Sequence, residues 1–162
     1  MKDTSQISTS GHLTSDQRAL LEDALQQFAW VVTTDQLKSL MPARSNSDAL
    51  RVISQLNDAG WLVRIKRGLY QLADLTSLGS ITLSRPVVAQ LLDPCSYVSF
   101  AAALNYHGLH DQLMRGYGSC TLKPRALTDL HGILYYFVKV KESSFFGFEE
   151  VTIDRQQARI AH

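Results

Sequence analysis

Hydrophobic residues near the N-terminus recur with the period of an α-helix. The predicted buried face of this helix consists of Leu20, Leu21, Ala24, Leu25 and Phe28. Thr14, three residues before Gln17, predicts a capping box at the start of the helix. A short β-prone stretch at residues 30–32 then breaks the helical period, which predicts a brief strand after this helix.

Two further helices are predicted before residue 60. Thr33 or Thr34 would cap the first of them, and Pro42 would end it. Ser45 would cap the second, with Asp48 in its first turn, where the helix dipole favours a negative charge. The predicted buried stripe of this second helix is Ala49, Leu50, Val52, Ile53 and Leu56.

The segment that follows Gly60 predicts a β-hairpin with a basic turn. Apolar residues alternate along it, with a slip at the turn, at Leu62, Ile65, Leu69 and Leu72. Arg64, Lys66 and Arg67 crowd the turn, and Gly68 supplies backbone freedom there. A helix, a short strand, two helices and a hairpin, in this order, are typical of a winged helix-turn-helix domain.

The second half of the chain has a different rhythm. Ser84 would cap a helix, Tyr97 would begin a short strand, and Ser99 would cap a small-residue helix that ends at Gly108. β-rich segments follow. The longest of these, residues 133–140, is almost continuously apolar or aromatic, which predicts a central position in a sheet.

These patterns predict an α+β fold with an N-terminal winged helix-turn-helix and a mixed α/β C-terminal domain with a small sheet. Residues 1–13 are predicted to be a flexible tail, residues 14–73 the winged helix-turn-helix, and residues 81–162 the second domain. Residues 74–80 are small and polar, as in a connector. The apolar pattern that runs to the last residue suggests that the second domain is incomplete.

The charge of the chain is local rather than global. Its 162 residues are 45% hydrophobic and 19% charged, which is typical of a folded globular protein, and the net charge is +1. That balance excludes a uniformly basic nucleic-acid coat. Residues 42–72, however, hold five basic residues against two acidic ones, so the predicted helix and hairpin carry +3.

No motif in the sequence gives a persuasive indication of an enzyme. His107, His110 and Asp111 lie close together, but no third well-placed metal ligand follows, and neither a phosphate-binding loop nor a dinucleotide fingerprint is present. Cys95 and Cys120 have no metal-binding spacing. We therefore predict no catalytic residue, no metal and no cofactor. With few thiols and no apolar run near the roughly 20 residues of a membrane span, the sequence indicates a reduced cytoplasmic setting without a membrane partner.

Two stretches resemble the AbiEi family, the antitoxins and transcriptional regulators of type IV toxin–antitoxin systems. The first is residues 60–70, GWLVRIKRGLY, and the second is residues 97–112, YVSFAAALNYHGLHDQ. The resemblance covers roughly residues 19–162 and implies a bacterial cytoplasmic protein, a monomer or weak dimer. Its first domain would bind inverted repeats in double-stranded DNA upstream of its own operon and repress it. Its second domain would counteract a nucleotidyltransferase-type toxin without forming a stable complex.

The resemblance also implies roles for eight polar or charged residues of the first domain. The residues expected on the major-groove side are Asn46, Ser47, Arg51 and Gln55. The residues expected on phosphate or in the minor groove are Arg64, Lys66 and Arg67, with Arg44 as a backbone contact at the helix start. The Tyr-His-Gly signature would serve packing and turn geometry, with a local hydrogen bond from His107.

Two other functions remain open. The winged helix could be a scaffold that does not bind DNA, with the aromatic region at residues 133–148 contacting a protein partner. Alternatively, His107, Asp111 or a cysteine could act in an enzyme. Members of the family usually continue past the point that matches His162, so we also expect this chain to be a fragment of a longer protein.

Overall fold

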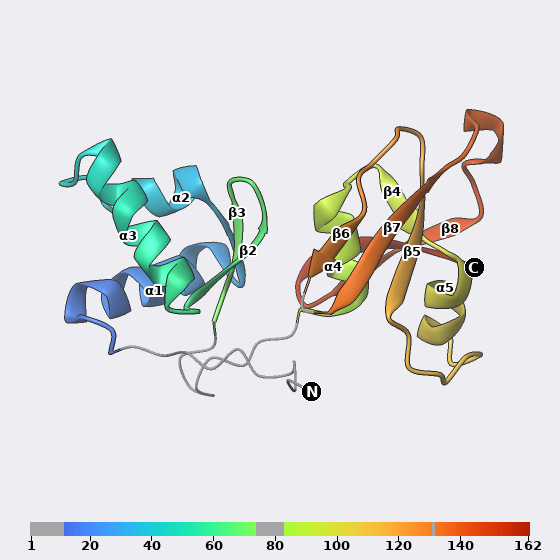
Figure 1. Cartoon of the computed structure of the whole chain (residues 1–162), viewed down its shortest axis with the longest axis horizontal. Helices are drawn as coiled ribbons and strands as arrows, with labels where there is room; N and C mark the ends of the chain where they lie inside the picture. The colour runs from blue at the N-terminus through green and yellow to red at the C-terminus, as the bar shows by residue number, and fades with distance from the viewer. Residues whose placement is uncertain (1–11, 74–82, 131) are drawn as a thin grey trace. The chain divides into compact units, whose positions relative to one another are not determined.

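The computed structural model describes residues 12–73, 83–130 and 132–162, which form a mixed α+β fold with helices and two sheets (Figure 1). Most of the predicted tail and all of the predicted connector lie outside these described residues. Two compact units are present, one before the gap at residues 74–82 and one after it. Within the described residues, no helix combines the length and the hydrophobicity that crossing a bilayer requires.

The first unit holds three helices and a three-stranded antiparallel sheet. Its elements, in chain order, are α1 (Ser15–Phe28), β1 (Val31–Thr33), α2 (Thr34–Ser39), α3 (Asn46–Asp58), β2 (Leu62–Lys66) and β3 (Leu69–Leu72). The strand order in the sheet is β1-β3-β2, so β3 pairs with both of the others. The hairpin formed by β2 and β3 therefore continues directly into pairing with the strand between α1 and α2.

Side-chain caps begin the three helices where the sequence predicts them. The Thr14 hydroxyl accepts a hydrogen bond from the Gln17 amide at 3.2 Å, and the Gln17 side chain accepts one from the Thr14 amide at 3.1 Å. Thr33 and Gln36 form the same reciprocal pair before α2, at 3.2 and 2.8 Å. Ser45 accepts from the Asp48 amide at 3.2 Å. Each cap satisfies amides that the first turn of a helix leaves unpaired.

The core of the first unit is built from one face of each helix and the inner face of the sheet. Its fully buried members include Leu21, Leu37, Leu56, Leu62, Leu72 and Val32. One predicted core residue is wrong: Leu50 is 43% exposed. The stripe of α3 that packs inward consists of Ala49, Val52, Ile53 and Leu56. At 100° per residue, Leu50 falls outside that stripe and beside the exposed Asn46 and Ser54.

The second unit is a six-stranded mixed sheet with two helices. Its elements are α4 (Arg85–Leu92), β4 (Ser96–Val98), α5 (Phe100–Tyr106), β5 (Gly116–Thr121), β6 (Thr128–Leu130), β7 (Ile133–Lys139), a 3-10 turn (Glu142–Ser144), β8 (Phe148–Ile153) and β9 (Gln156–Ala161). The strand order is β6-β7-β5-β4-β9-β8. The β5–β7 and β4–β9 pairs are parallel, and the other pairs are antiparallel. Helix α4 packs against β4 and β9.

The apolar segment at residues 133–140 does not take the central position that its composition predicts. It forms β7, the second strand from an edge, and only Tyr135 in this strand is buried. Tyr136 instead lies across β5, where a Cβ on Gly118 would stand 2.5 Å from the Tyr136 hydroxyl oxygen. The neighbouring strand thus leaves room for the aromatic ring because Gly118 has no side chain.

A buried carboxylate holds the middle of the second unit together. Asp93 is fully buried after α4, and its carboxylate accepts hydrogen bonds from the Thr121 hydroxyl at 2.6 Å, the Arg125 guanidinium at 3.1 Å and the Cys95 amide at 3.2 Å. Burial disfavours the charged form, but these three donors and the Arg125 charge outweigh it and hold the pKa of Asp93 below its ordinary range.

We expect Asp93→Asn to lower the free energy of unfolding at pH 7 by about 2 kcal/mol, because a charge-assisted network loses its charge. A lowered folded-state pKa stabilises the protein above the unfolded pKa of about 3.9, and this contribution is lost as the pH falls through the folded pKa. The difference in the free energy of unfolding between the unsubstituted protein and the variant should therefore narrow below about pH 4. Urea unfolding from pH 7 to pH 3 measures this difference. A difference that stays constant over this pH range would contradict the stabilising role of the Asp93 charge.

The turn between β8 and β9 is strained. Ile153 pairs with Gln156, and both residues between them have positive φ, 52° at Asp154 and 61° at Arg155. Two-residue turns of this kind favour glycine at the second position, since a left-handed conformation costs other residues on the order of 1 kcal/mol. Asp154 also makes a contact outside the turn, since its carboxylate accepts a hydrogen bond from the Ser84 amide at 3.0 Å, just before α4.

Arg155→Gly should therefore raise the stability of the second unit, by about 0.5 kcal/mol after the greater flexibility of unfolded glycine is subtracted. Arg155→Ala is the matched control, because it removes the same exposed side chain but keeps the left-handed strain. The midpoint of urea unfolding should rise for the glycine variant only. An equal rise for both variants would assign the effect to the lost side chain instead.

Candidate nucleic-acid interface

The outer face of α3 carries the polar residues that the sequence singles out. Ser47, Arg51 and Gln55 are spaced four residues apart, so they form one exposed row along the helix. Asn46 is also exposed, at the first position of α3. In this row, hydroxyl, guanidinium and amide groups point away from the core, which is the chemistry that base edges or phosphates can use.

The start of α3 orders part of this row. The Ser45 hydroxyl donates to the Asp48 carboxylate at 2.7 Å and lies 3.0 Å from the Ser47 hydroxyl. The Arg51 guanidinium donates to the other oxygen of Asp48 at 3.4 Å. Because both side chains of this ion pair are at least half exposed, the pair orients Arg51 without contributing much stability.

The hairpin presents a second group of cations. Arg64 and Lys66 are exposed on β2, and Arg67 is exposed in the two-residue turn before β3. Gly68 completes that turn with a φ of 76°, a conformation that favours glycine. No carboxylate lies within 4.0 Å of these three cations in the part of the chain that the structure describes.

The slip in the hairpin pattern is a bulge, and it lies inside β2 rather than at the turn. Arg64 is opposite Tyr70 and Lys66 is opposite Leu69, so the register shifts between them. The shift lets Leu62 and Ile65, three positions apart, both be buried. It therefore explains how a strand with imperfect alternation keeps its cations outside.

The hairpin turn is tied to the start of α2. The Thr34 amide, at the first position of α2, donates to the Gly68 carbonyl at 3.0 Å. The pairing of β1 with β3 adds further ladder contacts from Val31 to Thr33. These bonds hold the basic turn against the start of α2, and Figure 1 shows the hairpin beside α2.

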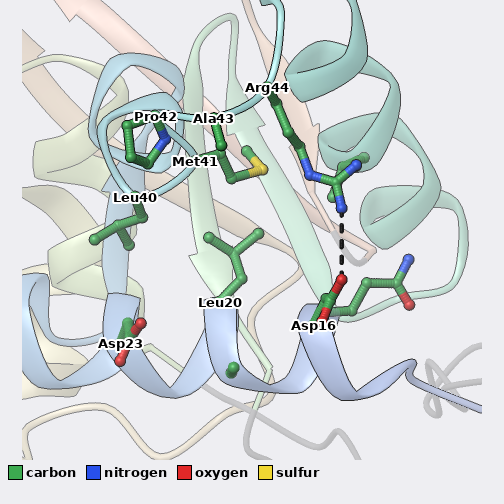
Figure 2. A pocket seen from close by; sticks show the side chains of 11 residues that line it. Asp16, Leu20, Asp23, Leu40, Met41, Pro42, Ala43 and Arg44 are labelled. Carbon is green, nitrogen blue, oxygen red and sulfur yellow. Dashed lines mark ion pairs between the residues drawn. The ribbon is translucent and has the colours of Figure 1, made fainter.

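Arg44 stands apart from the row on α3. It lines an open pocket of about 280 Å³ between α1 and the α2–α3 connection, together with Leu20 and Met41 (Figure 2). Its guanidinium points toward α1, 3.9 Å from the Asp16 carboxylate. A contact between Arg44 and a nucleic-acid backbone would require this exposed ion pair to open. The sequence did not indicate the pairing, because the two residues lie on different elements.

His107 and the two cysteines occupy structural positions in the second unit. The Nε2 atom of His107 lies 2.7 Å from the Ala161 carbonyl oxygen, which joins the end of α5 to the end of β9. The predicted local partner for His107 is therefore wrong. Cys95 is exposed, whereas Cys120 is buried beside Tyr97. Burial, followed by interaction with Cys120, raises the pKa of Tyr97 to about 12. The described ranges contain no group of three His, Cys, Asp or Glu residues placed to hold a metal ion.

Comparisons with known proteins bear on the fold. No family model matches the sequence, and no curated protein matches it. Among solved structures, the chain is similar to the crystal structure of the Rv2827c protein from Mycobacterium tuberculosis, with a TM-score of 0.60 and 19% sequence identity over 83% of this chain. The match covers 48% of that protein, so the chain spans about half its length. At this identity, the likeness concerns the fold alone.

Proposed function

We propose that this protein is a DNA-binding transcriptional repressor of the AbiEi antitoxin type and that its first unit is a winged helix-turn-helix. The observation that carries the proposal is the succession of two exposed groups. The polar row on α3 is followed, after a short connection, by a hairpin with Arg64, Lys66 and Arg67 on its surface. Such a helix and such a hairpin suit base edges and phosphates, respectively.

The architecture of the first unit supports this proposal. A helix, a strand, two packed helices and an antiparallel hairpin follow one another, and the first strand adds to the hairpin to complete the sheet. This is the element order of winged helix-turn-helix domains, in which the second helix of the packed pair enters the major groove. In this chain that helix is α3.

The contacts divide into two kinds. The major groove, roughly 12 Å wide, admits one α-helix, and Asn46, Arg51 and Gln55 carry groups that can bond base edges there. The hairpin cations would contact flanking phosphates, which gives affinity without sequence preference. Phosphates can compete for Arg51 because an exposed ion pair contributes only about 0–1 kcal/mol.

The repressed operon and the antitoxin activity rest on the family resemblance. The first unit would bind inverted repeats upstream of its own gene in a bacterial cytoplasm, as a monomer or weak dimer. The second unit would counteract a nucleotidyltransferase-type toxin without a stable complex. This function requires neither catalysis by this chain nor a bound metal or cofactor.

An exposed apolar surface favours a second candidate, a protein-interaction module. The large apolar side chains exposed on α5 and in the loop after it are Phe100, Leu104, Tyr106, Leu109 and Leu113, which is 96% exposed. In the aromatic region at residues 133–148, Phe145 and Phe148 pack on Tyr97, with ring centroids 5.0 and 4.7 Å away, whereas Phe146 is 72% exposed. Helix α5 and its loop therefore offer a partner more exposed large apolar side chains than that region does.

Fluorescence anisotropy tests the proposal directly. The purified chain is titrated with the duplex directly upstream of its gene and with a scrambled duplex, at two salt concentrations. Tighter binding to the upstream duplex, weakened by salt, supports the repressor. Equal and weak binding to both would refute it and favour the protein-interaction candidate.

We expect Arg67→Gln to weaken binding to both duplexes and to flatten the slope of log K against log salt by about 0.9, the value for one lost phosphate contact. Arg18→Gln is the matched control, since it removes the same charge from an exposed position on α1. Its slope should stay unchanged. If the two variants behaved alike, Arg67 would act only through net charge and not as part of the interface.

A further inference from the structure

One apolar side chain interrupts the polar outer face of α3. Leu50 is 43% exposed, although the inward stripe of the helix already includes Val52, Ile53 and Leu56. The core therefore does not account for Leu50.

The neighbours of Leu50 on α3 are polar and exposed. Asn46 lies four residues before it, Ser47 three before it and Ser54 four after it, so all three share its side of the helix. Single exposed leucines are common on protein surfaces. Leu50, however, lies on the face that the proposed function assigns to DNA. An apolar group of the DNA could therefore contact it.

That apolar group is the thymine methyl group. Of the groups that base pairs present in the major groove, hydrogen-bond donors and acceptors match polar side chains, while the C5-methyl of thymine matches an apolar one. A leucine that meets this methyl group removes apolar surface of both partners from water. A leucine that meets a base edge without the methyl leaves donors or acceptors unpaired, which disfavours such a sequence.

We propose that Leu50 is a specificity-determining residue that contacts a thymine methyl group in the operator. The inference rests on the proposed DNA-binding function and deepens it. Asn46, one helical turn or roughly 6 Å away along the axis, carries the amide that pairs with the N6 and N7 atoms of adenine. The two residues together select a stretch of the operator that contains A·T pairs.

Thymine-to-deoxyuridine exchange provides the test, because it removes the methyl group and keeps every hydrogen-bonding group of the base. The upstream duplex that the protein protects from cleavage is remade with deoxyuridine at one thymine at a time. At one or two positions, loss of the methyl should weaken binding of the unsubstituted protein about 4-fold, the equivalent of one buried methylene. The Leu50→Ala variant should bind the thymine duplex more weakly and should not respond to the exchange at those positions.

Leu104→Ala is the matched control, since Leu104 is 47% exposed on α5 of the other unit. It should bind and respond to deoxyuridine like the unsubstituted protein. Circular dichroism and urea unfolding should show Leu50→Ala to be folded, because the side chain lies outside the core. Leu50→Met, which keeps an apolar contact, should restore part of the response.

The outcomes separate this inference from the function on which it rests. Two outcomes would overturn the role of Leu50 without contradicting the repressor function. One is sequence-specific binding that no deoxyuridine exchange weakens, and the other is a Leu50→Ala variant that responds to the exchange like the unsubstituted protein. An unsubstituted protein that shows no preference for the upstream duplex would overturn both.

Discussion

The hydrogen bond between the Thr34 amide and the Gly68 carbonyl fixes the position of the basic hairpin turn in the first unit. The first amides of a helix have no partner within the helix, so α2 begins with a donor to spare. The hairpin turn supplies the acceptor, and the bonds between β1 and β3 continue the attachment. An isolated two-stranded hairpin is only marginally stable in water, and this attachment makes it part of a three-stranded sheet. The basic turn is thus held in a defined place at the start of α2.

Charge within the first unit is segregated in a way that its net charge conceals. Residues 12–41 contain four acidic and two basic residues, whereas residues 42–73 contain two acidic and five basic ones. The α1 and α2 segments are therefore negative, and the α3 and hairpin segments are positive. Such a distribution would favour the approach of a polyanion to the α3 and hairpin segments over the α1 and α2 segments. It also explains why a net charge of +1 is compatible with the proposed function.

The parts of the fold that sequence reasoning predicted are those encoded locally. Thr14, Thr33 and Ser45 cap their helices because a cap needs only residues three apart. The predicted burial of Leu50 is wrong because apolar character alone does not place a side chain on the inward face of a helix. The position of β7 depended on which strand would pair outside it, which no local pattern specifies.

The long-range contacts could not be predicted at all. Asp93 meets Thr121 and Arg125, and His107 meets Ala161, across separations of 28 to 54 residues. The same holds for the candidate site: the exposed row on α3 followed from helix periodicity, whereas the Arg44 ion pair with Asp16 required the packing of α1 on the α2–α3 connection. Local patterns indicated which side chains face outward. Only the fold showed which of these side chains form an ion pair with a residue of another element.

The second unit contains a strained aromatic residue on its surface. Phe100 begins α5 with a φ of 56°, which is a rare conformation for a bulky side chain. Its ring stacks on Tyr136 with centroids 6.3 Å apart, and a Cβ on Gly118 would stand 2.9 Å from it. A strained residue persists only where its surroundings enforce it, and such residues gather at functional sites. The first unit, by contrast, exposes polar groups and cations with a single leucine among them on α3. Under the proposed function, the first unit would engage DNA and the exposed apolar surface of the second would remain for a protein, so the two candidate functions need not exclude each other.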